Sequence, residues 1–157
     1  MKARIPFHVV HGAAGVLALL VILGFWSSTV LAELFGDAEV VATVKSAIAW
    51  CLLVFVPLLA VTGATGFAMA GPNPQGALAT KLRRMRIIAA NGLLVLAPSA
   101  LFLAWRANAG QFDTVFMVVQ AAELAAGVIN ATLIALNIRD GFRLAGRFRA
   151  MAESVRM

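Results

Sequence analysis

The sequence predicts an all-α integral membrane protein, a bundle of four transmembrane helices followed by an amphipathic helix at the membrane interface. Apolar residues make up 62% of the 157 positions and charged residues only 13%, with a mean hydropathy of +0.92. Soluble domains average about 45–50% apolar and about 25% charged residues. The apolar residues also gather into long runs, each able to cross the roughly 30 Å of hydrocarbon in a bilayer as a helix.

These runs follow one another along a single domain, residues 1–157. We expect the four spans at residues 9–32, 46–70, 87–105 and 114–138. Their nearly continuous apolarity differs from the alternation expected of barrel strands, and helices satisfy their own backbone amides in lipid. Turn-forming residues separate the runs at 36–37, 71–76 and 108–110. Asp113 is placed to cap the helix of the fourth span.

The basic residues predict the orientation of the helices. Eleven of the 13 Lys and Arg residues lie before the first span, between the second and third, or after the fourth. Only Lys45 and Arg106 fall on the other side, with most of the acidic residues. The positive-inside rule then places both termini in the cytoplasm and the protein in the inner membrane of a cell. The net charge of +6 follows this topology, so it does not indicate nucleic-acid binding.

The two ends of the chain each allow a second interpretation. Residues 140–157 place apolar side chains at helical spacing between arginines, which predicts a basic amphipathic helix that lies in the headgroup layer and attracts anionic lipid. A solvated tail is the alternative. The first span follows Lys2 and Arg4, as the apolar core of a signal peptide does, but its apolar run is longer than a signal peptide has. We therefore expect it to be retained.

Polar side chains within the spans are the most informative residues, because lipid makes them costly. Gln120, Glu123 and Asn130 lie along one face of the fourth helix. None of the predicted spans contains a basic residue near the depth of Glu123. We expect this carboxyl to be protonated, or hydrogen-bonded to a neighbour such as Gln120, Trp50 or Ser99.

The only histidines, His8 and His11, begin the first span in its cytoplasmic half. This layer is rich in glycine, which either allows close helix approach or leaves room for a flat cofactor. Histidine commonly ligates haem iron, and a four-helix bundle can enclose a porphyrin. We therefore expect a small b-type cytochrome with His11 as the metal ligand. The second ligand would be Met69, Met85, or His11 of a second copy. The other expected cofactor-binding residues are His8 and, as partners of the propionates, Arg83, Arg84 and Arg86.

Such a cytochrome would exchange electrons with quinone or with a partner complex. Gln120, Glu123 and Asn130 would then hydrogen-bond the quinone or relay a proton. The second ligand from another copy would require a homo-oligomer. Tryptophans near the non-cytoplasmic boundary predict an aromatic belt, formed by Trp26, Trp50 and Trp105.

Two other functions stay open. A carboxyl such as Glu123 within a span is also typical of proton coupling, which would make the protein a small transporter or channel. Short loops and small-residue helix faces fit a non-catalytic subunit or assembly factor of a larger membrane complex. The sequence contains no P-loop, HExxH or CxxC motif that would indicate a different chemistry.

Overall fold

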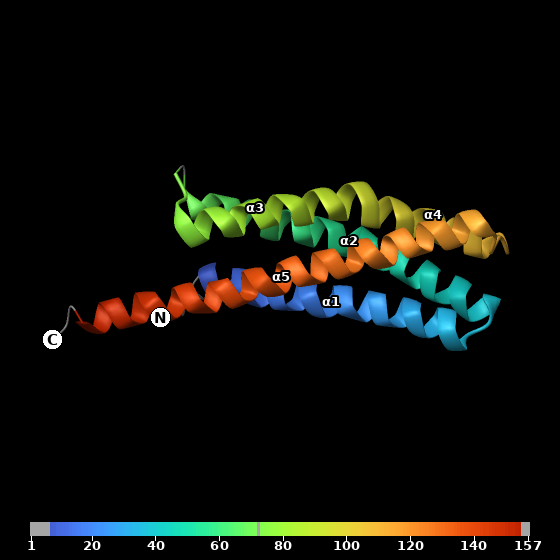
Figure 1. Cartoon of the computed structure of the whole chain (residues 1–157), viewed down its shortest axis with the longest axis horizontal. Helices are drawn as coiled ribbons and strands as arrows, with labels where there is room; N and C mark the ends of the chain where they lie inside the picture. The colour runs from blue at the N-terminus through green and yellow to red at the C-terminus, as the bar shows by residue number, and fades with distance from the viewer. Residues whose placement is uncertain (1–6, 72, 155–157) are drawn as a thin grey trace, which may run out of the picture.

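The computed structural model describes the backbone of residues 7–71 and 73–154 and the side chains of residues 10–68, 70–71 and 73–146. Within these residues every regular element is a helix (Figure 1). In chain order the elements are α1 (Phe7–Phe35), α2 (Ala38–Ala70), α3 (Gly76–Asn91), the π-helix η1 (Gly92–Leu96), α4 (Ala97–Asn108) and α5 (Thr114–Ser154).

Four helical stretches are long and apolar enough to cross a membrane: Val10–Phe35, Ala38–Ala68, Gly76–Asn108 and Thr114–Gly146. The third consists of α3, η1 and α4, so the predicted bundle of four spans is confirmed in number and order. Each stretch is longer than its predicted run, because polar and basic residues continue the helix at the ends. At 1.5 Å per residue the third and fourth stretches are about 50 Å long, well beyond the hydrocarbon thickness.

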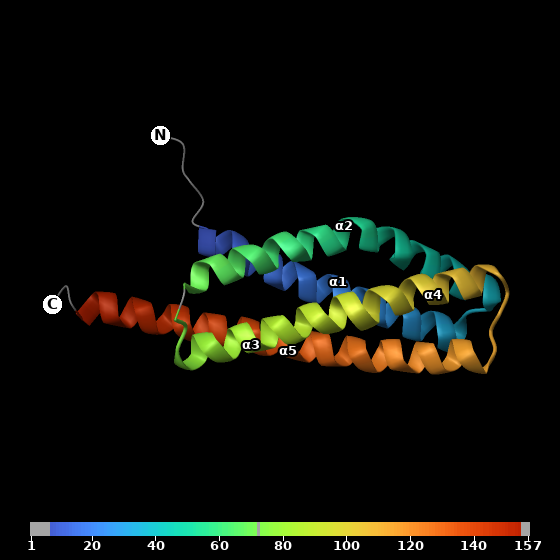
Figure 2. The same cartoon turned by 90° about the horizontal axis from the view of Figure 1, so that it is seen from above.

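The spans pack as a ring in chain order (Figures 1 and 2). α1 packs against α2 and α5, α2 packs mainly against α4, and both α3 and α4 pack against α5. α2 and α5 therefore face each other across the ring, and a side chain that joins them must cross the interior. α5 is the longest helix and continues past the other helices at its C-terminal end (Figure 2).

Turns connect the spans where the sequence predicts breaks, and an aspartate caps the helix that follows the first and the third of them. The Asp37 carboxylate accepts the backbone N–H three residues ahead at 2.9 Å and begins α2, and Asp113 does the same for α5 at 3.1 Å. Gly71 and Gly110 follow α2 and α4 with φ angles of 72° and 67°, which residues with a Cβ rarely adopt. The predicted cap at Asp113 is confirmed. A hydrogen bond from Arg106 lowers the pKa of this carboxyl, so the cap stays ionised into acidic solution.

The π-helix η1 ends two residues before Pro98. Proline lacks the N–H that would continue an α-helix, and its ring crowds the carbonyl four residues earlier. The backbone widens here, and the Ala97 N–H donates to the Gly92 carbonyl, five residues back. One additional residue per turn therefore accommodates the proline without ending the span.

Two apolar clusters fill the interior at different depths, one toward the end of the bundle where α2 and α5 begin and one near its middle. The first apolar cluster consists of Ala32, Val41, Leu103, Ala107 and Phe116. The second apolar cluster consists of Ala18, Ile22, Phe55 and Ile134. Along the three helices that contribute to both clusters, a buried polar residue falls between the two: Thr29 on α1, Lys45 on α2 and Gln120 on α5. The bundle thus contains a polar layer enclosed by apolar side chains.

The amphipathic helix expected at 140–157 is not a separate element in the part of the chain that is described. α5 continues without a break through this region to Ser154. The side chains from residue 147 onward, and residues 155–157 entirely, lie outside the described residues. The interfacial position of this segment stays a prediction.

Candidate functional site

Lys45 and Glu123 form a buried ion pair within the polar layer. Lys45 Nζ lies 2.6 Å from Glu123 Oε2, and the two side chains are 1% and 13% exposed. α2 and α5 begin at the same end of the bundle (Figure 1). Lys45 lies about 10 Å along α2 and Glu123 about 13 Å along α5, so the two residues have similar depth. The long lysine side chain therefore crosses the ring to reach the carboxylate.

This pair corrects the expectation that no basic residue approaches Glu123. Lys45 falls before the predicted second span because hydropathy ends a run at a charged residue. In the structure α2 begins at Ala38, about two turns earlier, with Asp37 as its N-cap, and Lys45 therefore lies within the helix. The predicted contact with Gln120 is confirmed, because its Nε2 donates to Glu123 Oε2 at 3.4 Å. Trp50 is instead 73% exposed.

A second carboxyl, Glu33 of α1, lies within electrostatic reach of both Lys45 and Glu123. Among the described residues, Glu33 Oε1 and Gln120 Oε1 are buried and have no hydrogen-bond partner. A buried acceptor without a donor costs about 1–3 kcal/mol. These two oxygens are therefore strong acceptors for a group that carries a proton. We name Glu33, Lys45, Gln120 and Glu123 the charged cluster.

Trp26 lies along α1 between Ile22 of the second apolar cluster and Glu33 of the charged cluster. Its Nε1 donates to the Leu124 carbonyl at 3.2 Å. The ring passes so close to α5 that a Cβ on Gly127 would lie 3.1 Å from Trp26 Cδ1. Trp26 is thus a contact between α1 and α5 rather than a member of the aromatic belt, whereas Trp50 and Trp105 are exposed as belt residues are.

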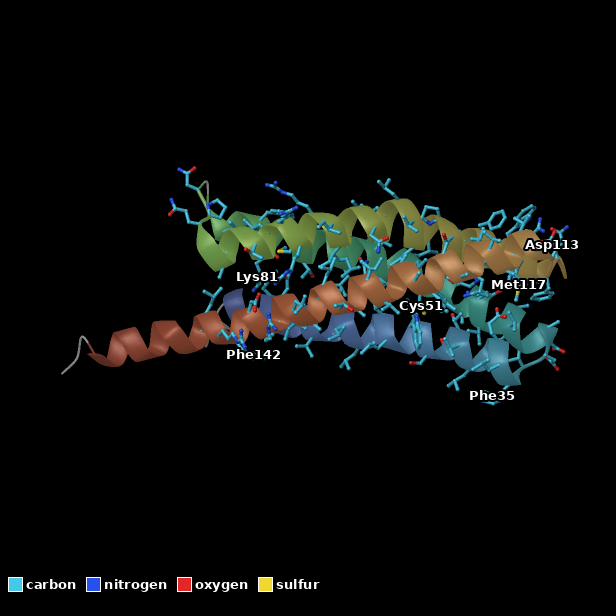
Figure 3. All side chains as sticks on the ribbon, viewed as in Figure 1. Phe35, Cys51, Lys81, Asp113, Met117 and Phe142 are labelled. Atoms are coloured by element: carbon cyan, nitrogen blue, oxygen red, sulfur yellow. The ribbon has the colours of Figure 1, made fainter. Side chains whose placement is uncertain are left out.

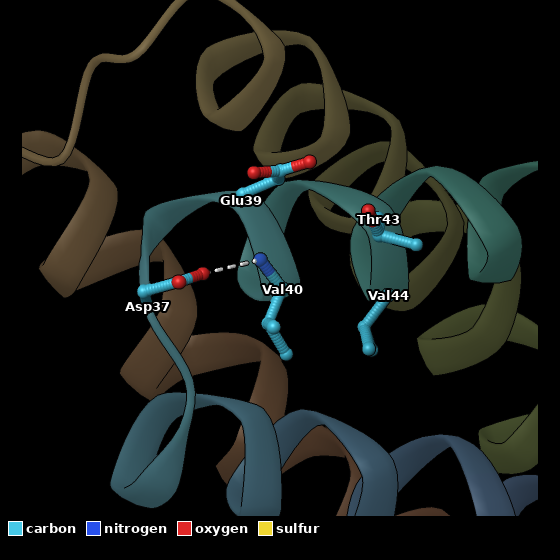
Figure 4. Close-up of a pocket in the computed structure, with 5 residues that line it drawn as sticks. All are labelled: Asp37, Glu39, Val40, Thr43 and Val44. Atoms are coloured by element: carbon cyan, nitrogen blue, oxygen red, sulfur yellow. Dashed lines mark hydrogen bonds between the residues drawn. The ribbon is translucent and has the colours of Figure 1, made fainter.

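A surface pocket of about 230 Å³ opens at the end of the bundle nearest the charged cluster (Figure 4). It is lined by Asp37, Glu39, Val40, Thr43 and Val44. Val44 immediately precedes Lys45 and also packs against the first apolar cluster. Neither Lys45 nor Glu123 lines this acidic pocket.

Asn130, predicted to contact a quinone or relay a proton, joins α5 to α3 next to η1. The side chain is 2% exposed. Its Oδ1 accepts from Asn91 Nδ2 at 2.9 Å, and its Nδ2 donates to the Ile88 carbonyl at 3.3 Å. Asn91 also donates to the Ala126 carbonyl at 2.9 Å. The two asparagines thus hold the neighbouring helices together.

Two of the expected haem ligands meet at the other end of the bundle. His11 of α1 and Met85 of α3 converge on Gly66 of α2, where an added Cβ would lie 2.7 Å from both His11 Cε1 and Met85 Cε. The side chains of His8 and Met69 lie outside the described ones. Within the described residues, no group of three or more His, Cys, Asp or Glu side chains is arranged to hold a metal ion.

The basic residues expected near the propionates also lie at this end, which we call the basic end. It carries Lys81, Arg83, Arg84 and Arg86 of α3 and Arg139 and Arg143 of α5. Figure 3 shows Lys81 at the opposite end of the bundle from Asp113. Arg84 is used in an ion pair with Asp140, with Nη1 and Oδ2 2.6 Å apart. Arg83 and Arg86 are exposed.

The fold and the charged cluster together define the class of protein. Four apolar helices of spanning length make this a multi-pass membrane protein, and an ion pair lies in its interior. Comparison of the chain with protein-family models, curated protein sequences and solved structures finds no match.

Proposed function

We propose that this protein is a small proton-coupled membrane transporter or channel in which the Lys45–Glu123 pair is the titrating site. The observation that carries the proposal is the 2.6 Å contact between these charges inside four membrane-spanning helices. Ionisable residues in membrane spans are rare and typically mark ion or proton pathways. Apolar residues of similar volume often stabilise a bundle as well as a buried ion pair does. Stability alone therefore does not explain the pair.

In this proposal one proton moves through the charged cluster in each cycle. A proton that reaches the Glu123 carboxylate neutralises it and ends the attraction to the Lys45 ammonium. Glu33 then offers the ammonium a second carboxylate within electrostatic reach. Loss of the proton from Glu123 restores the original pair. No electrons are transferred, and the net change per cycle is the displacement of one proton.

Proton flux into vesicles tests the proposal. Purified protein is reconstituted into vesicles that contain a pH-sensitive dye, and a potassium gradient with valinomycin supplies the driving potential. The wild type is expected to conduct protons above the level of protein-free vesicles. Glu123→Gln keeps the shape of the side chain but removes its titrating carboxyl, so its flux is expected to fall to that background.

Glu39→Gln is the matched control for this experiment. It removes the same charge from the exposed first turn of α2, outside the charged cluster. We expect it to conduct like the wild type. Circular dichroism and elution volume in detergent establish that both variants are folded. A folded Glu123→Gln protein with wild-type flux would contradict the proposal.

Haem-linked electron transfer is our second proposal, favoured by the convergence of His11 and Met85 over Gly66. An imidazole and a thioether form a known pair of haem ligands, and a bound haem would supply one-electron chemistry. Both side chains pack directly against Gly66, so a porphyrin would require them to separate. If His11 of a second copy is the other ligand, the protein is a homo-oligomer.

Absorption spectra of the purified protein, oxidised and then reduced with dithionite, test this second proposal. A haem protein is expected to show a Soret band that His11→Ala abolishes. His8→Ala, measured in parallel, shows which of the two histidines ligates the iron, because His8 is also an expected cofactor-binding residue. Colourless protein from cells supplied with excess haem would overturn the proposal.

A further inference from the structure

A second pocket, of about 210 Å³, lies between α3 and α5 at the basic end. It is lined by Ala77 and Thr80 of α3 and by Asp140, Arg143 and Leu144 of α5. The lining thus combines one cation, one carboxylate and one hydroxyl with two apolar side chains. None of these residues belongs to the charged cluster or to the expected haem ligands.

Cations outnumber carboxylates around this pocket. Asp140 accepts from Arg84 Nη1 at 2.6 Å and also pairs with Arg139 Nη2 at 3.2 Å, so its charge is already balanced. Among the described side chains, no carboxylate lies within ion-pair distance of Arg143 or Lys81. The Lys81 ammonium is directed toward α5, because its Nζ lies 3.0 Å from the position of a Cβ on Gly141. An anion is therefore the complementary ligand.

The position of the pocket along the helices favours a lipid over a free anion. The third and fourth spans exceed the hydrocarbon thickness by about 20 Å, so their ends reach the level of the headgroups. Thr80 lies near the beginning of the third span and Arg143 near the end of the fourth.

We propose that this pocket binds the headgroup of an anionic phospholipid. The phosphate accepts hydrogen bonds from the Arg143 guanidinium and from the Thr80 hydroxyl, which makes only a long bond of 3.3 Å to the Gly76 carbonyl. Ala77 and Leu144 contact the glycerol and the first carbons of the acyl chains. Basic pockets between membrane helices bind such headgroups in other proteins.

Thermal unfolding of the full chain in detergent tests the proposal, with added phosphatidylglycerol, phosphatidylcholine or inorganic phosphate as three separate probes. Phosphatidylglycerol is expected to raise the unfolding temperature saturably, and the other two probes are expected to leave it unchanged. Arg143→Gln is expected to weaken the apparent affinity for phosphatidylglycerol about fivefold, as the loss of one cation at a membrane surface does. Thr80→Val is expected to weaken it as well.

Arg86→Gln is the matched control, since it removes the same charge from the basic end but does not line the pocket. It is expected to retain nearly wild-type affinity. Equal losses in Arg86→Gln and Arg143→Gln would overturn the proposal in favour of general surface attraction. Equal protection by phosphatidylcholine, or by inorganic phosphate alone, would overturn it as well. The outcome does not depend on proton flux, so this proposal and the proposed transport function fail or stand separately.

Discussion

Replacing Lys45 with methionine is expected to lower the free energy of unfolding by about 3–5 kcal/mol, the usual cost of removing one partner from a buried ion pair. Methionine keeps most of the length of the lysine stem, so packing across the ring changes little. The Glu123 carboxylate, at 13% exposure, is then left without its opposite charge. Unfolding in mixed detergent, followed by circular dichroism, measures the loss. Arg83→Met, an exposed cation at the basic end, is the control and should change stability by less than about 0.5 kcal/mol.

The double variant Lys45→Met/Glu123→Leu distinguishes a structural role of this pair from a functional one. Removing both charges together is expected to return stability close to that of the wild type, because no unpaired charge remains in the interior. Proton flux is nevertheless expected to stay at background. A double variant as unstable as Lys45→Met would show that the two residues do not pair. A stable double variant that still conducts protons would show that the pair only holds the helices together.

Gly66→Ala is expected to lower the free energy of unfolding by about 1–3 kcal/mol, the usual cost of overfilling a packed interior. The new Cβ would lie 2.7 Å from His11 Cε1 and from Met85 Cε, and 3.3 Å from His11 Nε2. The expected decrease is informative, because replacing glycine with alanine in a helix otherwise raises the free energy of unfolding by roughly 0.5–1 kcal/mol. A Cβ added at Gly63, one turn away on α2, would have no neighbouring atom within 4 Å. Gly63→Ala should therefore show this ordinary increase in the free energy of unfolding.

Met85→Ala in the Gly66→Ala background is expected to recover part of this loss. The methionine methyl is the flexible neighbour of the new Cβ, whereas the His11 ring is rigid. Unfolding measurements on the two single variants and the double variant give their interaction energy. If Gly66→Ala proves as stable as Gly63→Ala, the imidazole and the thioether do not converge on α2.

The parts of the fold that depend on local sequence could be predicted. Continuous apolar runs fix the number and order of the spans, and Asp113 has both the residue type and the position of a helix cap. Helical spacing also predicts the polar face of α5, including the contact between Gln120 and Glu123. These features need only neighbours along one helix, which hydropathy and helical spacing describe.

The ion pair could not be predicted from hydropathy, because Lys45 and Glu123 are 78 residues apart and meet only across the ring. A signal was nevertheless present. Asp37 is an N-cap residue, which starts a helix eight positions before Lys45 and so places the lysine within the span. Val41, Lys45 and Ile48 then fall on one helical face, and all three are buried. The convergence on Gly66 had no comparable signal, since glycines at such spacing usually serve ordinary helix packing.

The π-helix before Pro98 lets the two halves of the third span face different neighbouring helices. One additional residue rotates everything after it by about 100° around the helix axis. Upstream of η1, α3 faces mainly α5, and downstream of it α4 faces mainly α2, with Leu103 and Ala107 in the first apolar cluster. One continuous span thereby packs mainly against α5 at one depth and mainly against α2 at another. Two short helices could do the same only with a loop inside the lipid.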